Sequence, residues 1–119
     1  MKIVRPKPCQ FCPYKIETPS GVWHADEYEK LRAYDEETFN QPFATFACHE
    51  SPKAHCCGWA QCHGDKLLSL RLAGYPEIPE ITAPIHASGN DAANFGQRDI
   101  ENPSREARAA MRILDRKIH

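Results

Sequence analysis

The chain has 119 residues, 41% of them hydrophobic, with 15 basic and 16 acidic side chains and a net charge of −1. This length is typical of one domain with a modest core, so we expect a single domain over residues 1–119. The balanced charge does not favour nucleic-acid binding, for which a local basic patch would be needed. No apolar run is long enough to span a membrane and residues 2–8 lack a signal-peptide core, so we expect a cytoplasmic protein without membrane contact.

The predicted elements of the N-terminal half are short. Residues 2–5 are expected to form a strand that ends at Pro6, because proline cannot donate a hydrogen bond to a neighbouring strand. Apolar residues at helical spacing predict a helix over 26–34. The aromatic and β-branched run 43–47 predicts a strand that leads into Cys48.

The elements that follow the last cysteine are predicted to be helices and a connector. A short helix is expected over 66–73, stopped by Gly74. Prolines make 75–84 an extended connector. Residues 88–91 are suited to begin a short helix over 92–95.

The clearest predicted helix is the amphipathic segment 103–118, in which Pro103 suits the first position. Its apolar residues share one face at helical spacing: Ala107, Ala110, Met111, Leu114 and Ile118. Its charged residues lie on the other face: Arg105, Arg108, Arg112, Asp115, Arg116 and Lys117. We interpret this outer face as solvated, with contact to an acidic partner as the alternative.

All six cysteines lie between positions 9 and 62: Cys9, Cys12, Cys48, Cys56, Cys57 and Cys62. In a reducing cytoplasm such cysteines are more often metal ligands or redox groups than disulfides. We therefore expect segments 8–15 and 46–63 to supply thiolates to one metal ion. Binding of that ion would hold together a small α+β domain with a short sheet and three or four helices.

The predicted metal ligands are Cys9, Cys12, Cys48 and Cys56. Adjacent cysteines seldom bind one ion together because their side chains diverge, so either Cys56 or Cys57 is a spare, and the choice between them stays open. The reserve ligands are Cys57, His49, Cys62 and His63. Gly58 is expected to permit a tight turn in the ligand loop, and Lys7 and Lys15 are expected to favour the thiolate form.

Four thiolates suit a structural Zn²⁺ ion and also a [4Fe–4S] cluster. Cysteine followed by proline, as in Cys12-Pro13, occurs in cluster proteins, whereas the small size of the chain and the lack of a visible redox partner favour zinc. A catalytic zinc would need an open position and a general base, and His49-Glu50 is the adjacent pair suited to that role.

Several linked motifs occur in order along the chain: P-C-Q-F-C-P-Y at 8–14, G-V-W-H at 21–24, F-A-C-H at 46–49, C-C-G-W at 56–59 and R-L-A at 71–73. Over about residues 8–96 the chain resembles a small uncharacterised family of actinobacterial and bacteriophage proteins. The resemblance implies that the four predicted ligands are the family's recurrent cysteines, with His49 beside the third. It implies that Cys57 and Cys62 are less regular, and it brings no known activity.

We therefore expect a small, non-enzymatic interaction module with a structural zinc. The phage setting implied by the resemblance makes a host or bacterial protein the expected partner, and the host cytoplasm the expected location. The first alternative is an iron–sulfur protein with a redox-sensing or structural cluster. The second is a metal-assisted hydrolase using His49 and Glu50, or a nucleic-acid-binding module.

Overall fold

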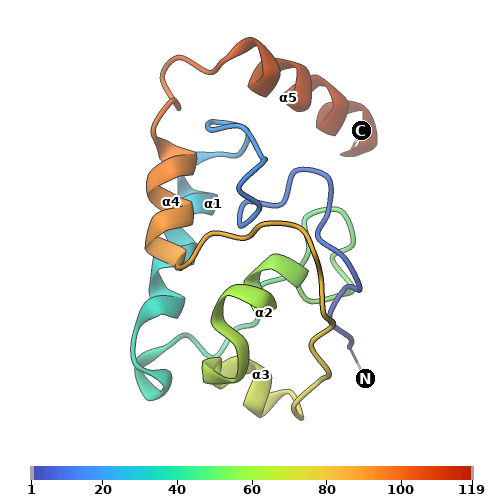
Figure 1. The fold of residues 1–119 in the computed structure, drawn as a ribbon, viewed down its shortest axis with the longest axis vertical. Helices are drawn as coiled ribbons and strands as arrows, with labels where there is room; N and C mark the ends of the chain where they lie inside the picture. Colours follow the sequence, from blue (N-terminus) through green and yellow to red (C-terminus); the bar gives the residue numbers. More distant parts are fainter. Residues whose placement is uncertain (1, 119) are drawn as a thin grey trace.

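The computed structural model describes residues 2–118, apart from the side chains of 117 and 118. Its regular structure is helical, and the α-helices are α1 (Ala25–Glu29), α2 (Cys57–His63), α3 (Leu68–Leu72), α4 (Gly89–Gln97) and α5 (Arg105–Ile118). Three 3₁₀ helices join or extend them: η1 (Lys30–Asp35), η2 (Thr38–Asn40) and η3 (Gly64–Lys66). In Figure 1, α1 and α4 pack together, α2 and α3 lie at the lower end, and α5 crosses the upper end.

The predicted sheet is wrong, and the domain is helical rather than α+β. Between residues 2 and 118 the extended segments pair only through isolated bridges. Two of these bridges share His55, which pairs with Val4 in parallel and with Ala47 in antiparallel orientation. Pro6 cannot extend the first pairing because it has no N–H donor. At the start of the second predicted strand, Phe43 is 78% exposed and has no strand partner among the described residues.

Helix α2 was not expected from the sequence, which predicts a ligand loop at this place. The helix begins after Cys56, whose sulfur accepts the backbone N–H of Trp59 at 3.4 Å. Trp59 is fully buried and its ring meets Tyr34 edge-on, with 5.4 Å between ring centroids. Burial of this large side chain stabilises a helix whose residues have modest intrinsic helical preference.

Helix α4 packs against α1 and η1. Its N-cap is Ser88, whose hydroxyl accepts the Asp91 N–H at 3.0 Å. The helix continues through Gly96, which was predicted to follow its end. Instead, Gly96 lies against the ring of Tyr28, at a place where a side chain would not fit.

The N-terminal loop is joined to the end of α4 by the Gly21 N–H, which donates to the Gly96 carbonyl at 2.8 Å, and by a buried hydroxyl. Ser20 Oγ donates to the Gly96 carbonyl at 3.0 Å and accepts the Asp99 N–H at 2.9 Å. These contacts join residues that are far apart in the sequence.

The remaining helix predictions are confirmed with shifted ends. The helix expected over 26–34 is formed by α1 followed by η1, and the helix expected over 66–73 is reduced to α3. The connector 75–84 has no regular structure, as predicted.

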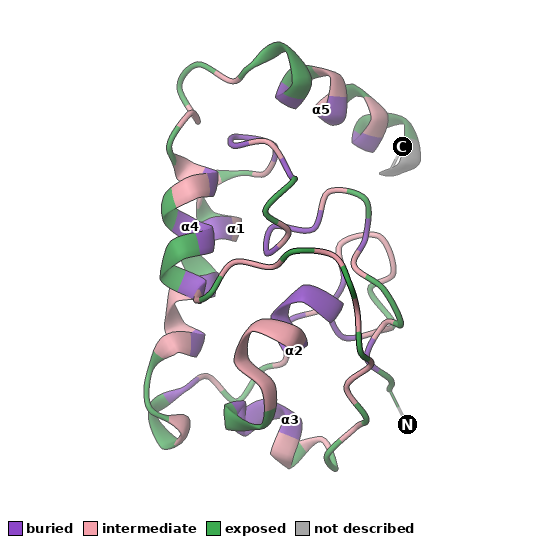
Figure 2. Cartoon of the chain, in the orientation of Figure 1, coloured by how far each residue is buried: buried purple, intermediate pink, exposed green. Residues whose placement is uncertain are grey.

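Helix α5 begins two residues later than predicted, after Ser104, whose hydroxyl accepts the Ala107 N–H at 3.1 Å. Its inner face forms a second small core, which consists of Ala107, Ala110, Leu114 and Val22 with Phe11 and Trp23 packed against it. Figure 2 shows these buried positions on the side of α5 that faces the body.

The predicted roles of the Lys117 and Ile118 side chains fall outside the described residues. None of the helices within residues 2–118 combines the length and the apolar character needed to cross a membrane.

Candidate metal centre

The four predicted cysteine ligands lie in the protein interior. Cys9 and Cys12 occupy the N-terminal turn, where the Cys12 N–H donates to the Cys9 carbonyl at 3.2 Å. Cys48 and Cys56 lie on either side of the loop that pairs through His55. Each of the four side chains is at most 3% exposed. The pairing around His55 therefore carries the second cysteine segment to the first.

One pair of sulfurs has the spacing of ligands on a single ion. Cys12 Sγ and Cys56 Sγ are 3.7 Å apart, and tetrahedral zinc–sulfur bonds of about 2.3 Å place neighbouring sulfurs about 3.8 Å apart. Cys9 is hydrogen-bonded to Cys12, and Cys48 Sγ accepts from Arg5 Nη1 at 3.6 Å. Among the described residues, no group of three or more Cys, His, Asp or Glu side chains is placed so that it could hold a metal ion. The Cys12–Cys56 pair has the spacing of one edge of the predicted tetrahedron, and the structure does not assemble the other two predicted ligands around it.

The surroundings of Cys9 and Cys12 favour the protonated thiol form of both residues. The hydrogen bond with Cys12, together with burial, raises the pKa of the Cys9 thiol. The hydrogen bond with Cys56 raises the pKa of the Cys12 thiol well above its ordinary value. A bound divalent ion reverses this preference, because a coordinating thiol is deprotonated outright. The donor set is therefore chemically suited to a metal: soft sulfur atoms shielded from water.

Arg5 is the basic residue beside the cysteines, and sequence reasoning missed it in favour of Lys7 and Lys15. Its guanidinium contacts Cys48 Sγ at 3.6 Å and Glu50 Oε2 at 3.5 Å. Lys15 instead donates to a backbone carbonyl at the surface. Four thiolates around a divalent ion leave two excess negative charges, which Arg5 would partly offset. No local sequence signal marks this role, because Cys48 lies 43 residues away from Arg5 along the chain.

Gly58 has a different role from the predicted tight turn. It lies in the first turn of α2, where an added Cβ would stand 2.6 Å from Cys12 Sγ and 2.8 Å from Tyr14 Cβ. Both distances are shorter than side chains tolerate. The glycine therefore lets α2 approach the N-terminal cysteine turn.

The reserve ligands other than His49 divide between two places. Cys57 is buried and interacts electrostatically with Cys48 and Cys9, and burial raises the pKa of its thiol to about 11. Cys62 and His63 instead line an open cavity between η1, α2 and the start of α4. Burial raises the pKa of the Cys62 thiol to about 12.

His49 and Glu50 do not face a common point. The His49 ring lies 4.2 Å from the Trp23 ring, centroid to centroid, and its Nε2 is 3.6 Å from a Glu27 carboxylate oxygen. Glu50 accepts the Gln10 N–H at 2.8 Å. These separate contacts do not support the two residues acting together on one water molecule.

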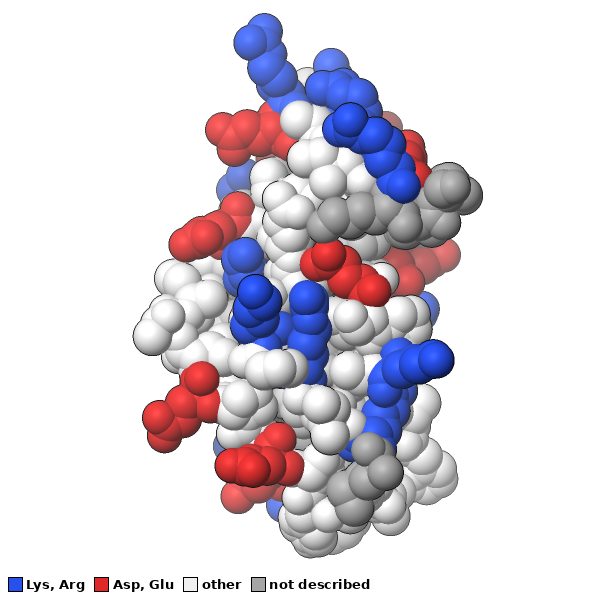
Figure 3. Space-filling view, turned by 90° about the vertical axis from the view of Figure 1, so that its right-hand side faces the viewer, with Lys and Arg blue, Asp and Glu red and all other residues white. Residues whose placement is uncertain are grey.

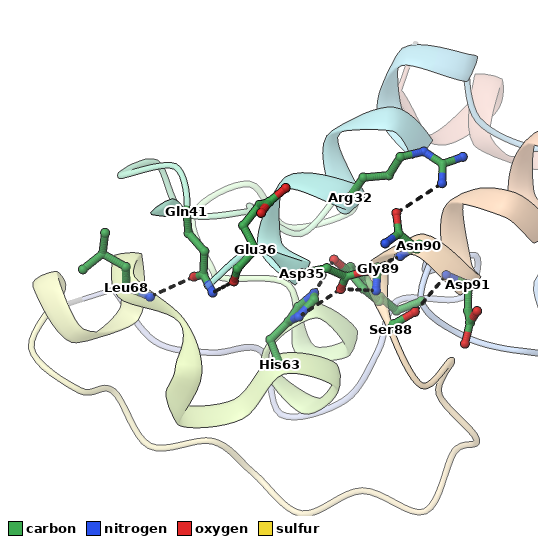
Figure 4. Close-up of polar contacts among 11 residues, drawn as sticks. Arg32, Asp35, Glu36, Gln41, His63, Leu68, Ser88, Gly89, Asn90 and Asp91 are labelled. Atoms are coloured by element: carbon green, nitrogen blue, oxygen red, sulfur yellow. Dashed lines mark hydrogen bonds and ion pairs between the residues drawn. The ribbon is translucent and has the colours of Figure 1, made fainter. Parts of the chain in front are cut away.

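A second polar cluster adjoins the open cavity, whose volume is about 980 Å³. The Tyr14 hydroxyl is 3.0 Å from His63 Nε2, and His63 Nδ1 is 3.7 Å from Asp35 Oδ1. Asp35 accepts the backbone N–H groups of Gly89 and Asn90, both at 2.7 Å. Figure 4 shows His63, Asp35 and the first residues of α4 facing one another. His63 is hydrogen-bonded to Tyr14 and lies beside Asp35, so this histidine stands where three segments meet.

Asp35→Asn is expected to lower the free energy of unfolding by about 2 kcal/mol. The aspartate supplies two charge-assisted acceptors at the positive end of α4, and asparagine retains one neutral acceptor and turns an amide donor toward an N–H group. Urea denaturation followed by circular dichroism measures the loss. Asp91→Asn, in the exposed first turn of α4, is the matched control and should change stability by only about 0.5 kcal/mol. Equal losses in the two variants would contradict the assigned role of Asp35.

Acidification is expected to destabilise the protein, in part through His63. Burial lowers the pKa of His63, and the Asp35 carboxylate offsets this only in part. The unfolded chain therefore takes up the proton first as pH falls below about 6.5, so this stabilisation is present above that pH and is lost below it. His63→Gln should reduce the slope of unfolding free energy against pH, between pH 7.5 and 5.5, by at most about 1.4 kcal/mol per pH unit.

Cys62→Ser is the control for this pH experiment, because it changes the same cavity without removing a group that titrates in this range. It should keep the wild-type slope. An unchanged slope in His63→Gln would show that this histidine does not contribute to the acid sensitivity.

No curated protein and no solved structure matches the chain significantly. A family match extends beyond the residues that carry the resemblance seen in the sequence. It includes both cysteine segments and most of α5. Over residues 4–114 the chain matches, and so belongs to, a family of unknown function (DUF6283).

Proposed function

We propose that the chain is a non-enzymatic binding module held together by one structural zinc ion. The ligands in this proposal are Cys9, Cys12, Cys48 and Cys56. The observation that carries it is the separation of 3.7 Å between Cys12 Sγ and Cys56 Sγ, two buried atoms from distant segments. When bound, the ion would link these segments and neutralise the repulsion among the thiolates.

The same separation favours a single ion over a [4Fe–4S] cluster. In such a cluster each thiolate binds a different iron, which holds the sulfurs farther apart than ligands of one ion. The cluster remains the second candidate because all four donors are cysteines.

The side chains near the cavity favour binding over catalysis. His63 Nε2 is held by the Tyr14 hydroxyl at 3.0 Å, and Asp35 lies beside Nδ1 at 3.7 Å. Cys62, with a pKa of about 12, is predominantly the unreactive thiol at neutral pH. The resemblance to actinobacterial and phage proteins adds the proposal that the partner is a host or bacterial protein in the cytoplasm.

Elemental analysis of protein purified without oxygen tests this proposal. We expect one zinc per chain and a colourless sample. A brown sample with broad visible absorption that contains iron and sulfide would show that the protein binds the iron–sulfur cluster in place of zinc. Folded protein that holds neither metal would contradict both candidates.

A further inference from the structure

Helix α5 carries a continuous row of arginines. These residues, spaced i, i+3, i+7 and i+11, are Arg105, Arg108, Arg112 and Arg116. At about 3.6 residues per turn, they fall within about 80° of the helix circumference and extend over about 17 Å. All four are exposed. We call this row the arginine stripe.

The packing of α5 directs the arginine stripe away from the body of the protein. The opposite face of the helix is buried through Ala107, Ala110 and Leu114, which pack on Val22 and its neighbours. This contact fixes the rotation of the helix about its axis. Figure 3 shows basic side chains projecting from the end of the molecule where α5 lies.

The stripe has no acidic partner among the side chains that the structure describes. Arg108 makes one long contact, 3.5 Å, with the Asn102 side-chain oxygen. Helix α5 itself contains two acidic residues, Glu106 to one side of the stripe and Asp115 at its edge. Four arginines against these two leave a local positive excess on a chain with a net charge of −1.

We propose that the arginine stripe binds the phosphate backbone of duplex DNA, which adds a nucleic-acid partner to the binding module proposed above. Guanidinium groups match phosphate oxygens in bidentate geometry, and one arginine per turn suits a regularly spaced polyanion. The molecule extends over 40 Å in its longest direction, and α5 crosses one end of that axis, where a duplex can reach it. A helix of about 10–12 Å diameter enters the B-DNA major groove, about 12 Å wide. The deep, narrow major groove of duplex RNA does not admit it.

Four phosphate contacts predict weak and strongly salt-dependent binding. The logarithm of the association constant should fall against the logarithm of salt concentration with a slope of about −3.6. The dissociation constant should be on the order of 10⁻⁴ M in 0.1 M salt, which is typical of non-specific binding.

Fluorescence anisotropy with a labelled 20-base-pair DNA duplex, in 20–200 mM NaCl, tests this inference. The double variant R108Q/R112Q should halve the slope to about −1.8 and weaken binding about 60-fold in 0.1 M salt. The control K53Q/K66Q removes two exposed lysines outside α5 and should retain the wild-type slope. Equal losses in both variants, or no binding by the wild type in 20 mM NaCl, would overturn the proposal.

Two further probes separate DNA from other polyanions. Duplex RNA of the same sequence should bind more weakly than DNA, and poly-glutamate should not compete at equal charge concentration. Tighter binding of poly-glutamate would assign the stripe to an acidic protein instead. Metal content and thermal stability of R108Q/R112Q should equal those of the wild type, so failure of this inference is distinguishable from failure of the zinc proposal.

Discussion

Under the zinc proposal, Cys12→Ser is expected to remove the metal ion and to abolish cooperative folding. Cys12 is fully buried, and its sulfur is 3.7 Å from Cys56 Sγ. A serine hydroxyl is a poor zinc ligand and would leave a buried polar group in the core. Structural zinc contributes about 10–16 kcal/mol in zinc-finger peptides, which is comparable to the entire stability of a typical domain. Metal analysis and thermal unfolding followed by circular dichroism measure the two effects.

Two other cysteine variants make this test specific. Cys62→Ser, in the open cavity, should keep the metal and unfold at nearly the wild-type temperature. Cys57→Ser should also keep the metal if Cys56 is the ligand. A folded, metal-loaded Cys12→Ser protein would contradict the proposed site. Metal loss in Cys57→Ser alone would move the fourth ligand to Cys57.

Gly96→Ala is expected to lower the free energy of unfolding by more than about 3 kcal/mol. On an exposed helix surface the same change would stabilise by about 0.5–1 kcal/mol, because alanine is the better helix former. Here an added Cβ would stand 2.1 to 2.6 Å from three ring atoms of Tyr28. The Tyr28 side chain is 1% exposed, and its hydroxyl accepts the Trp23 N–H at 3.2 Å. The ring cannot move aside without breaking that contact, so α4 must separate from α1.

Asn94→Ala is the matched control, since Asn94 lies on the exposed side of the same helix. It should leave stability unchanged or raise it slightly. Urea denaturation of both variants gives the comparison. If Gly96→Ala were as stable as Asn94→Ala, the contact with the Tyr28 ring would not be close-packed.

The sequence predicts the elements that carry their own local signals. The apolar spacing of 103–118 identifies α5, and Ser88 identifies the start of α4, because amphipathic period and capping act within a few residues. Helix α2 is too short to show an amphipathic period, and its N-cap, Cys56, is not one of the residue types that the sequence signals. The helix depends on the burial of Trp59. The expected strands do not form a sheet for a related reason. Runs of β-branched and aromatic residues favour extended backbone, but a sheet also needs neighbouring segments with free hydrogen-bond donors.

In the candidate site, too, the sequence predicts some features and misses others. Cysteine spacing alone predicts which segments meet, because two thiols in a C-x-x-C turn require donors from elsewhere to complete a metal shell. The positions of Arg5 and Gly58 beside the cysteines follow from chain crossings that local pattern does not encode. His63, predicted as a reserve ligand, lies between Tyr14 and Asp35 instead.

The bond between Ser20 and Gly96 has a consequence for how the protein is made. During translation, Ser20 leaves the ribosome long before Gly96 and Asp99, its partners in the finished molecule. At about 5–20 residues per second, the N-terminal loop waits for several seconds before it can be fixed in place. The loop therefore remains without these contacts until the chain has been made as far as Asp99.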